Sequence, residues 1–231
     1  MFIDYAPKVF HNLRKLYRIN SEDYLRSLCH ENFIVSLLNF YFYYKLIDLK
    51  GNLILIKNRS LRELCSAGKS GSFFYFSYDS KYVVKTIPEH EFLFFYSILK
   101  DYYFHIHDNK DTLMQRYYGL HILHFNDQKY YFVLMNNVFG TNLKVHYKYD
   151  LKGSKYRRLS RDFNKKDYDD YDYSIPMKDL DFIDRKEKMD LNCNEAELLY
   201  KQAENDAMFL SLKNVNDYSF LIGIHEISKL F

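Results

Sequence analysis

The stretch GKSGSFFYFSYDSKYVVK, residues 68–85, constrains the fold of this chain more than any other. Residues 73–78 and 81–87 are rich in aromatic and β-branched side chains, which favour strands. The polar Asp79 and Ser80 between them are typical of a turn. The stretch therefore predicts two antiparallel strands joined as a hairpin.

A loop rich in glycine and serine precedes this hairpin, and its second strand carries a lysine. Gly68, Ser70 and Gly71 would let backbone N–H groups approach an anion, because glycine has no Cβ in the way. Lys85 follows two valines. This combination indicates a site for nucleotide phosphates of the kinase type. An ordinary hairpin with a surface lysine is the alternative that the local pattern leaves open.

Residues 68–70 also match the end of a P-loop, but the rest of that motif is missing. A P-loop needs a glycine five residues before its second one, where this chain has Glu63. A helix should follow a P-loop, whereas a strand is predicted here. We therefore reject a P-loop site.

Helices are predicted on both sides of the hairpin. Pro7 and Ser21 each begin a short helix, and a longer one begins at Pro88 with apolar residues at helical spacing. Glu91 in its first turn would reach Lys85, as a helix glutamate does in protein kinases, or lie in solvent near the helix N-terminus. The sequence leaves both interpretations open.

Two more strands, residues 117–125 and 130–135, complete a predicted antiparallel sheet with one crossing helix. The chain leaves this sheet through MNNVF, residues 135–139. We interpret that exit as a hinge whose backbone would meet a nucleotide base.

A basic cluster follows the predicted strand 143–150. The net charge of the chain is only +3, which argues against a strongly basic nucleic-acid-binding protein. Five basic residues nevertheless lie close together around Gly153: Lys152, Lys155, Arg157, Arg158 and Arg161. This density suits phosphate binding, and a solvated charged face is the alternative.

The remaining segments predict a surface insert, a strand at 177–183, a helix capped by Asn194 with Glu197, and a strand at 220–224. Asp217 lies just before that last strand. A kinase-type fold places its catalytic carboxylate there, although an isolated aspartate at such a point is more often a turn residue.

Three widely spaced cysteines fit neither a disulfide framework nor a zinc site, which favours a reducing compartment. Residues 33–49 are apolar but interrupted by Asn39, Lys45 and Asp48. Because a membrane span needs about 20 apolar residues, we expect a buried or interfacial helix there.

Together these segments resemble the phosphatidylinositol phosphate kinase family. The DLKGS string at residues 150–154 is the most specific element, and GKSGSFFYF and MNNVF are most similar to phosphatidylinositol 4-phosphate 5-kinases. The matching stretches occur in the family's order: residues 68–86, 111–121, 135–154, 177–182 (MKDLDF) and 215–225 (VNDYSFLIGIH). Asn216 and Phe220 depart from the family's methionine and leucine.

The resemblance implies an α+β, kinase-like two-lobed fold, with an antiparallel sheet and a crossing helix in the N-lobe and an incomplete C-lobe. Residues 1–231 would form one kinase domain that lacks its C-terminal part, with insertions at 31–60 and 159–174. The family continues to a second magnesium-binding aspartate and an activation loop. We therefore expect the 231-residue chain alone to lack appreciable lipid kinase activity.

The resemblance also implies roles for single residues. Lys152 and Arg158 would meet the phosphate of the lipid headgroup, and Asp217 would orient or deprotonate an inositol hydroxyl. ATP would be accompanied by Mg2+, whose ligands stay unassigned. The predicted ATP-binding residues are Gly68, Ser70, Gly71, Lys85, Asn136 and Asn137.

The implied function is ATP-dependent phosphorylation of phosphatidylinositol 4-phosphate to phosphatidylinositol 4,5-bisphosphate. The implied partners are a phosphoinositide headgroup, an anionic membrane surface and a second copy in a homodimer, with no nucleic acid. Such a protein would be cytoplasmic and peripheral to the cytoplasmic face of membranes, above all the plasma membrane. The alternative is a catalytically inactive module of the same fold that binds phosphoinositides or anionic membranes.

Overall fold

The computed structural model of the chain describes residues 1–28, 64–65, 72–125, 127–160 and 176–226. The chain divides into two compact units. The first unit contains Met1–Lys110 and Met114–Gly140, and the second contains Asp111–Leu113 and Thr141–Phe231. The predicted glycine-rich loop, the apolar stretch 33–49 and most of both predicted insertions lie outside the described residues.

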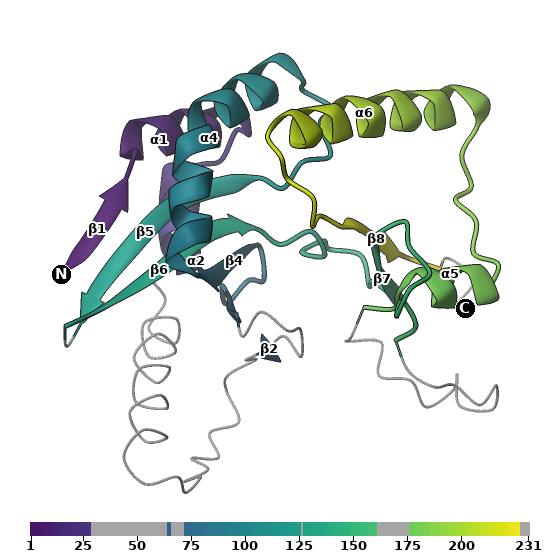
Figure 1. Cartoon of the computed structure of the whole chain (residues 1–231), viewed down its shortest axis with the longest axis horizontal. Helices are drawn as coiled ribbons and strands as arrows, with labels where there is room; N and C mark the ends of the chain where they lie inside the picture. The colour runs from purple at the N-terminus through teal and green to yellow at the C-terminus, as the bar shows by residue number, and fades with distance from the viewer. Residues whose placement is uncertain (29–63, 66–71, 126, 161–175, 227–231) are drawn as a thin grey trace, which may run out of the picture. The chain divides into compact units, whose positions relative to one another are not determined.

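An antiparallel sheet forms the centre of the first unit (Figure 1). Its strands lie in the order β1-β5-β6-β4-β3-β2. The predicted hairpin is confirmed as β3 and β4, and β4 lies in the interior of the sheet. The strands are β1 (Phe2–Tyr5), β2 (Leu64–Cys65), β3 (Phe73–Phe76), β4 (Tyr82–Ile87), β5 (Tyr117–Phe125) and β6 (Gln128–Asn136).

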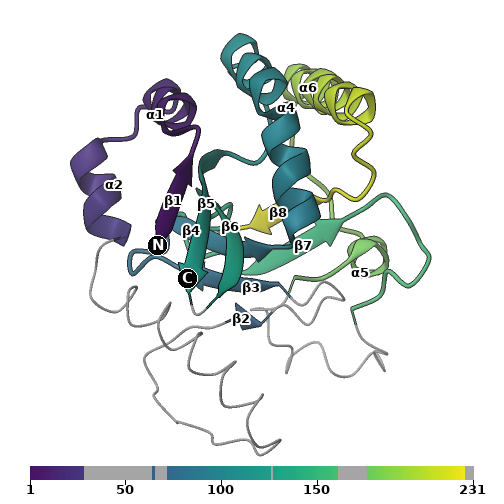
Figure 2. The same ribbon diagram turned by 60° about the vertical axis from the view of Figure 1, so that its left-hand side comes forward.

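Helices cover both faces of this sheet (Figure 2). The predicted helices are present as α1 (Pro7–Leu16), α2 (Ser21–Leu28) and α4 (Glu89–Asp108). Tyr24 of α2 packs against Tyr82 with ring centroids 5.3 Å apart, whereas Phe92 of α4 packs against Tyr131 at 5.0 Å. Tyr82 pairs with Asn136 of β6, five residues after Tyr131, so the two helices lie on opposite faces.

Asp79 fixes the turn of the hairpin and joins it to α2. Its carboxylate accepts hydrogen bonds from Ser77 Oγ at 2.7 Å and from Ser27 Oγ of α2 at 2.6 Å. Lys81 adds a backbone N–H at 3.2 Å and an ion pair at 3.4 Å. The polar turn predicted from Asp79 thus also anchors a helix that lies far away in the sequence.

The edge strand β1 was not predicted. It pairs with β5 in a register that places Ile3 opposite Ile122 and Tyr5 opposite Leu120. Four residues are too few to give an alternation that stands out from the helix that follows. Its formation depends on the long-range partner β5, which the local sequence does not reveal.

A two-stranded ladder, β7 (Tyr147–Leu151) with β8 (Phe220–Ile224), organises the second unit. Tyr147, Tyr149 and Met177 form a buried cluster on it, and Met177 pairs with Tyr149 as an isolated parallel bridge. The strand predicted at 143–150 is shorter than expected, because the ladder begins only at Tyr147.

The strand predicted at 177–183 was wrong. Only Met177 makes a strand-like bridge, and Asp179–Asp184 form the short helix α5. Asp181 accepts a hydrogen bond from the N–H of Lys178 at 2.9 Å, which satisfies an amide at the start of that helix. This capping interaction therefore favours a helix where a strand was predicted.

The long helix α6 (Cys193–Leu212) is present, but its predicted cap was two residues too late. Asn192 Oδ1 accepts from the N–H groups of Asn194 and Glu195, both at 3.0 Å. Glu195 returns the bond by accepting from Asn192 N–H at 3.0 Å. Glu197, the predicted partner, pairs with Lys201 instead.

Asp206 of α6 holds the short segment Asp111–Leu113, which is part of the second unit. One carboxylate oxygen accepts from Thr112 Oγ1 at 2.7 Å and the other from Leu113 N–H at 2.7 Å. Gln202 of the same helix donates a third bond at 3.0 Å. Asp206 is buried, so these bonds replace the water that its carboxylate would otherwise bind.

Among the helices in the described ranges, none is long and apolar enough to cross a membrane. Cys193 is an exposed free thiol. The apolar helix expected at 33–49 cannot be compared, because it lies outside the described residues.

Candidate functional site

Lys85 lies in the middle of the sheet of the first unit, on the face that α4 covers. It pairs with Phe74 of β3 and Val133 of β6, and residues directly opposite one another share a face. Its ammonium lies over the Phe74 ring, 5.9 Å from the centroid. The loop residues Gly68, Ser70 and Gly71 lie outside the described residues, so their relation to Lys85 stays a prediction.

Glu91 of α4 and Lys85 are both described, and they form no ion pair in this structure. The Glu91 charge lies instead near Tyr117. Burial, and then the Glu91 carboxylate, raise the pKa of Tyr117 to about 12. Of the two interpretations of Glu91, the structure therefore favours an exposed glutamate near the N-terminus of α4 over a partner of Lys85.

Asn136 closes the end of β6 through hydrogen bonds within the first unit. Its Oδ1 accepts from Gln115 Nε2 at 2.7 Å and from Arg116 N–H at 3.1 Å. Its own N–H donates to the carbonyl of Arg116 at 3.0 Å. These contacts fix the point at which the chain leaves the sheet.

Asn137 and Gly140 pack the exit segment against the hairpin turn. Asn137 Nδ2 donates to the carbonyl oxygen of Ser80 at 2.8 Å. A Cβ on Gly140 would lie 2.5 Å from that same oxygen, so this close approach requires glycine. Within residues 136–140, Val138 is the residue whose backbone N–H and carbonyl make no hydrogen bond.

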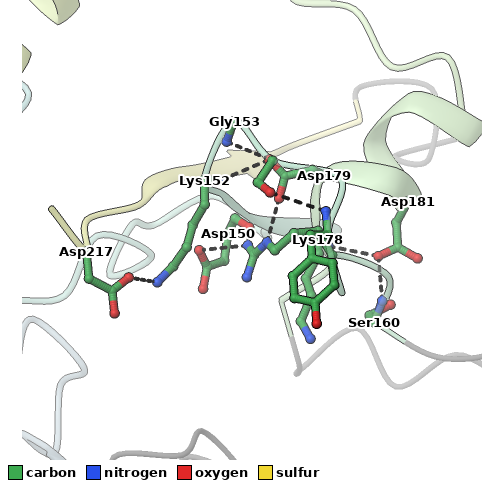
Figure 3. A network of polar contacts seen from close by, with 11 residues as sticks. Asp150, Lys152, Gly153, Ser160, Lys178, Asp179, Asp181 and Asp217 are labelled. Carbon is green, nitrogen blue, oxygen red and sulfur yellow. Dashed lines mark hydrogen bonds and ion pairs between the residues drawn. The ribbon is translucent and has the colours of Figure 1, made fainter.

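In the second unit, the segment with Lys152 and Gly153 is built on the carboxylate of Asp179 (Figure 3). One oxygen of Asp179 accepts the backbone N–H groups of Lys152 at 2.9 Å and of Gly153 at 2.8 Å. Gly153 has φ +67°, a left-handed conformation that favours glycine, and a Cβ there would meet nothing within 4 Å. Glycine is therefore needed here for its backbone freedom and not for space.

Arg158 closes the other end of this loop. Its Nε donates to the second oxygen of Asp179 at 2.7 Å. Its Nη2 donates to the carbonyl oxygen of Asp150 and lies 3.3 Å from the Asp150 carboxylate. Its Nη1 makes no hydrogen bond with any residue that the structure describes.

Asp181 binds the C-terminal end of the same loop. It is fully buried and accepts from the N–H groups of Lys178 at 2.9 Å and Ser160 at 3.0 Å. Leu180 N–H also donates to the Arg158 carbonyl at 2.9 Å. Helix α5 and the basic loop are therefore joined by one bond from a loop amide to Asp181 and one bond from a helix amide to a loop carbonyl.

The structure brings Lys152 and Asp217 together as an ion pair (Figure 3). The register of the β7–β8 ladder brings them to the same end, because Leu151 pairs with Phe220. Lys152 directly follows Leu151, and Asp217 lies three residues before Phe220. The Lys152 side chain is 31% exposed and that of Asp217 is 85% exposed. Both charged groups are thus accessible to a ligand.

Asp179 stays ionised in these surroundings. Burial alone would raise the pKa of its carboxyl, but the hydrogen bonds from Arg158, Lys152 and Gly153 outweigh it and lower the pKa. An ionised carboxylate can only accept hydrogen bonds, which matches the donors around it.

The sequence reasoning missed Asp179 and Asp181. It interpreted MKDLDF as a short strand. The available signal was the spacing of the two acids in a short, otherwise apolar segment, where both also fit the first turn of a helix. Their link to the basic cluster is a tertiary contact across about 20 residues.

The chain is similar to known proteins over nearly its whole length. A family profile described as phosphatidylinositol-4-phosphate 5-kinase matches residues 55–230. A probable phosphatidylinositol phosphate kinase of Dictyostelium discoideum is 37% identical over 97% of this chain and 28% of its own length. A phosphatidylinositol 4-phosphate 5-kinase of Plasmodium falciparum is 34% identical over 99% of this chain and 13% of its own length.

The human phosphatidylinositol 4-phosphate 5-kinase type-1 alpha is similar to the same extent. It is 34% identical over 98% of this chain, and the chain spans 34% of its length. The chain thus covers about a third or less of each of these relatives. The match nevertheless extends over nearly all of this chain and includes the DLKGS loop and the segment of Asp217. The chain belongs to the phosphatidylinositol-4-phosphate 5-kinase family.

Proposed function

We propose that this chain serves the ATP-dependent phosphorylation of phosphatidylinositol 4-phosphate to phosphatidylinositol 4,5-bisphosphate. The observation that carries the proposal is the pairing of Lys152 with Asp217 at the end of the β7–β8 ladder. The Lys152 ammonium is suited to a phosphate, and the Asp217 carboxylate is suited to a hydroxyl. The two groups are in contact. A phosphorylated inositol ring presents both a phosphate and a hydroxyl.

Asp217 is proposed to accept the proton of the ring hydroxyl as the hydroxyl oxygen attacks the terminal phosphorus of ATP. The bond from that phosphorus to the bridging oxygen breaks, and ADP leaves. The carboxylate is highly exposed, so a hydroxyl can approach it. An ammonium group has three N–H donors. Lys152 can therefore hold Asp217 with one donor and a substrate phosphate with another.

We assign the phosphate of the lipid headgroup to Lys152 and Arg158. Support for Arg158 comes from its Nη1, which keeps a donor while Nε and Nη2 are used by Asp179 and Asp150. Arg158 would thus contribute one edge of its guanidinium rather than a bidentate pair.

ATP is proposed to bind in the first unit, with its phosphates between Gly68, Ser70, Gly71 and Lys85. Lys85 is suited to this role because its ammonium has an aromatic neighbour, Phe74, and no carboxylate partner among the described residues. Asn136 and Asn137 shape the exit from the sheet, and Val138 keeps its backbone groups for the adenine base.

Mg2+ normally accompanies ATP in phosphoryl transfer. The described residues do not fit a Mg2+ site, since no group of three or more candidate ligands lies together among them. Asp179 accepts N–H donors on both oxygens, and Asp217 pairs with Lys152. Asp181 accepts two N–H donors on one oxygen, and its other oxygen is buried without a hydrogen-bond partner in the described part of the chain. We therefore assign no step to a metal held by these residues.

The proposed substrate is a membrane lipid, so the protein is expected at the cytoplasmic face of membranes, above all the plasma membrane. The exposed basic side chains of Lys152, Lys155 and Arg157 would add attraction to anionic lipids. The homodimer that the family resemblance implies stays a prediction without assigned residues.

The test uses the protein as the cell makes it. Purified wild-type protein should transfer labelled phosphate from ATP to phosphatidylinositol 4-phosphate in vesicles. The Asp217→Asn variant should lose that transfer while it still binds the vesicles. Vesicle binding by the wild type without any transfer would overturn the proposal in favour of a binding module.

A further inference from the structure

We propose that Asp179 is a positioning residue for lipid recognition, which acts by holding the backbone of Lys152 so that its ammonium lies beside Asp217. This inference rests on the proposed function, because it concerns the residue assigned to the lipid phosphate. Asp179 would touch neither the lipid nor ATP. Its effect would reach the substrate through Lys152 and, by the bond to its guanidinium, through Arg158.

Asp179 Oδ1 holds the backbone of the loop at two amides. Two successive N–H groups, those of Lys152 and Gly153, converge on a single oxygen at 2.9 and 2.8 Å. Successive amides can converge on one anion only in a restricted backbone conformation, which here includes φ +67° at Gly153. The carboxylate therefore fixes the direction in which the Lys152 side chain leaves the backbone.

The other oxygen of Asp179 accepts from Arg158 Nε at 2.7 Å, so one buried carboxylate holds both ends of the loop 152–158. The Arg158 carbonyl is held in addition by Leu180 N–H of α5. The loop cannot shift relative to α5 without breaking several of these bonds together.

Arg158 neutralises Asp179 with a side chain that is only 13% exposed, whereas Lys152 uses its backbone and not its ammonium on Asp179. The ammonium is left for Asp217 and for a phosphate. Because the Gly153 and Lys152 amides are occupied by Asp179, the phosphate must be met by side chains and not by this glycine backbone.

The amide variant Asp179→Asn tests this role closely. It keeps the size of the side chain but replaces one acceptor oxygen by an NH2 donor, which must face either Arg158 or the two backbone amides. Either orientation sets donor against donor and releases part of the loop. Asp184→Asn, at the exposed end of the same helix α5, is the matched control.

The experiment measures binding of two soluble probes, inositol 1,4-bisphosphate and inositol 1-phosphate, by calorimetry. Asp179→Asn should weaken binding of the bisphosphate about tenfold, as expected when hydrogen bonds to a charged group are lost. Asp179→Asn should bind ATP as the wild type does. The Asp184→Asn control should bind the bisphosphate as the wild type does. In a Lys152→Ala background, the Asp179→Asn substitution should weaken binding clearly less than tenfold, because interacting residues are not additive and only the effect through Arg158 remains.

Additive losses in the two backgrounds would overturn the inference, since Asp179 would then act independently of Lys152. Unchanged binding by a folded Asp179→Asn protein would overturn it as well. If Asp179→Asn does not fold, Asp179→Glu enters the same cycle. It keeps the charge for Arg158 but displaces the carboxylate from the amides, and the same two outcomes decide.

The proposed function fails in a different way. If the wild type binds both probes alike, or if Lys152→Ala binds the bisphosphate as the wild type does, the phosphate contact of Lys152 is wrong and the positioning role falls with it. If Lys152→Ala loses the preference for the bisphosphate and Asp179→Asn keeps it, only the positioning role is wrong.

Discussion

Lys152 donates a hydrogen bond to Asp217, although 65 residues separate them in the sequence. The two residues flank the last pair of the β7–β8 ladder, Leu151 with Phe220. Two strands with a buried aromatic core thus carry a cation and a carboxylate at the same end. Both residues lie just outside the ladder, Lys152 directly after β7 and Asp217 three residues before β8, so their contact depends on where the two paired strands end.

The first prediction concerns Lys152→Met, which removes the ammonium but keeps a side chain of similar length. Binding to vesicles with phosphatidylinositol 4-phosphate should weaken about fivefold, since each basic residue near an anionic surface contributes about 1 kcal/mol. Raised salt should weaken wild-type binding and shrink the difference. Vesicle sedimentation measures both effects. Lys188→Met, an exposed lysine of the same unit, is the control, and an equal loss in both variants would contradict a specific site.

The second prediction concerns Lys85→Met. The Lys85 ammonium lies over Phe74 in the described structure, so methionine can keep that packing while the positive charge is lost. ATP affinity measured by calorimetry should fall about tenfold or more, because a charge facing the phosphates is removed. The melting temperature should stay close to that of the wild type. Lys129→Met at the exposed start of β6 is the control, and ATP binding by Lys85→Met at wild-type affinity would refute the assignment.

The third prediction separates two reasons for glycine. Gly140→Ala should destabilise the protein by about 1–3 kcal/mol, because the new Cβ must displace the Ser80 carbonyl 2.5 Å away. Gly153→Ala should cost about 1–2 kcal/mol through its left-handed backbone alone. Urea unfolding gives both values. Asparagine, which tolerates that conformation, should recover part of the loss at position 153 but not at 140, and equal recovery at both would contradict this distinction.

The fourth prediction is a pH dependence set by His121 of β5. Its ring packs against Phe2 and Phe132, and its Nδ1 lies 3.2 Å from Asp4. Burial lowers the pKa of His121 from 6.5 to about 4, against the opposing effect of Asp4. Because protons then bind the unfolded chain first, the unfolding free energy should fall as the pH is lowered from about 6.5 towards 4, by at most about 1.4 kcal/mol per pH unit.

This dependence is measured by urea unfolding at several pH values. The His121→Phe variant keeps a ring of similar size between Phe2 and Phe132 but does not titrate, so its stability curve should be flatter over that range. His90→Phe, at an exposed position of α4, should keep the wild-type curve. Parallel curves for the wild type and His121→Phe would show that another group is responsible.

The sequence predicted the elements whose signals are local. The hairpin of β3 and β4 follows from strand-forming residues around the turn at Asp79, and α4 follows from its apolar spacing. Strand β1 was missed because it depends on its distant partner β5. Helix α5 was missed because it is six residues long and combines one local bond, from Lys178 N–H to Asp181, with contacts to the distant 152–160 loop. Boundaries failed where a nearby residue made a better cap, as Asn192 does for α6.

The candidate site shows the same division. Lys152 and Asp217 were singled out from the basic cluster, the position before a strand and the family resemblance, and they lie together. The sequence could not reveal that two nitrogens of the Arg158 guanidinium donate hydrogen bonds to Asp179 and Asp150. Buried carboxylates leave no periodic pattern, because a single oxygen can organise amides from any part of the chain.

The segment Asp111–Leu113 has a practical consequence for dissecting this protein. The chain leaves the first unit after Lys110, joins the second for three residues, and returns at Met114. No single cut can therefore yield two intact pieces. A fragment that ends at Gly140 would carry Thr112 and Leu113 without Asp206, and the complementary fragment would bury the Asp206 carboxylate without two of its donors. Either unit should be isolated by replacing this segment with a linker rather than by truncation.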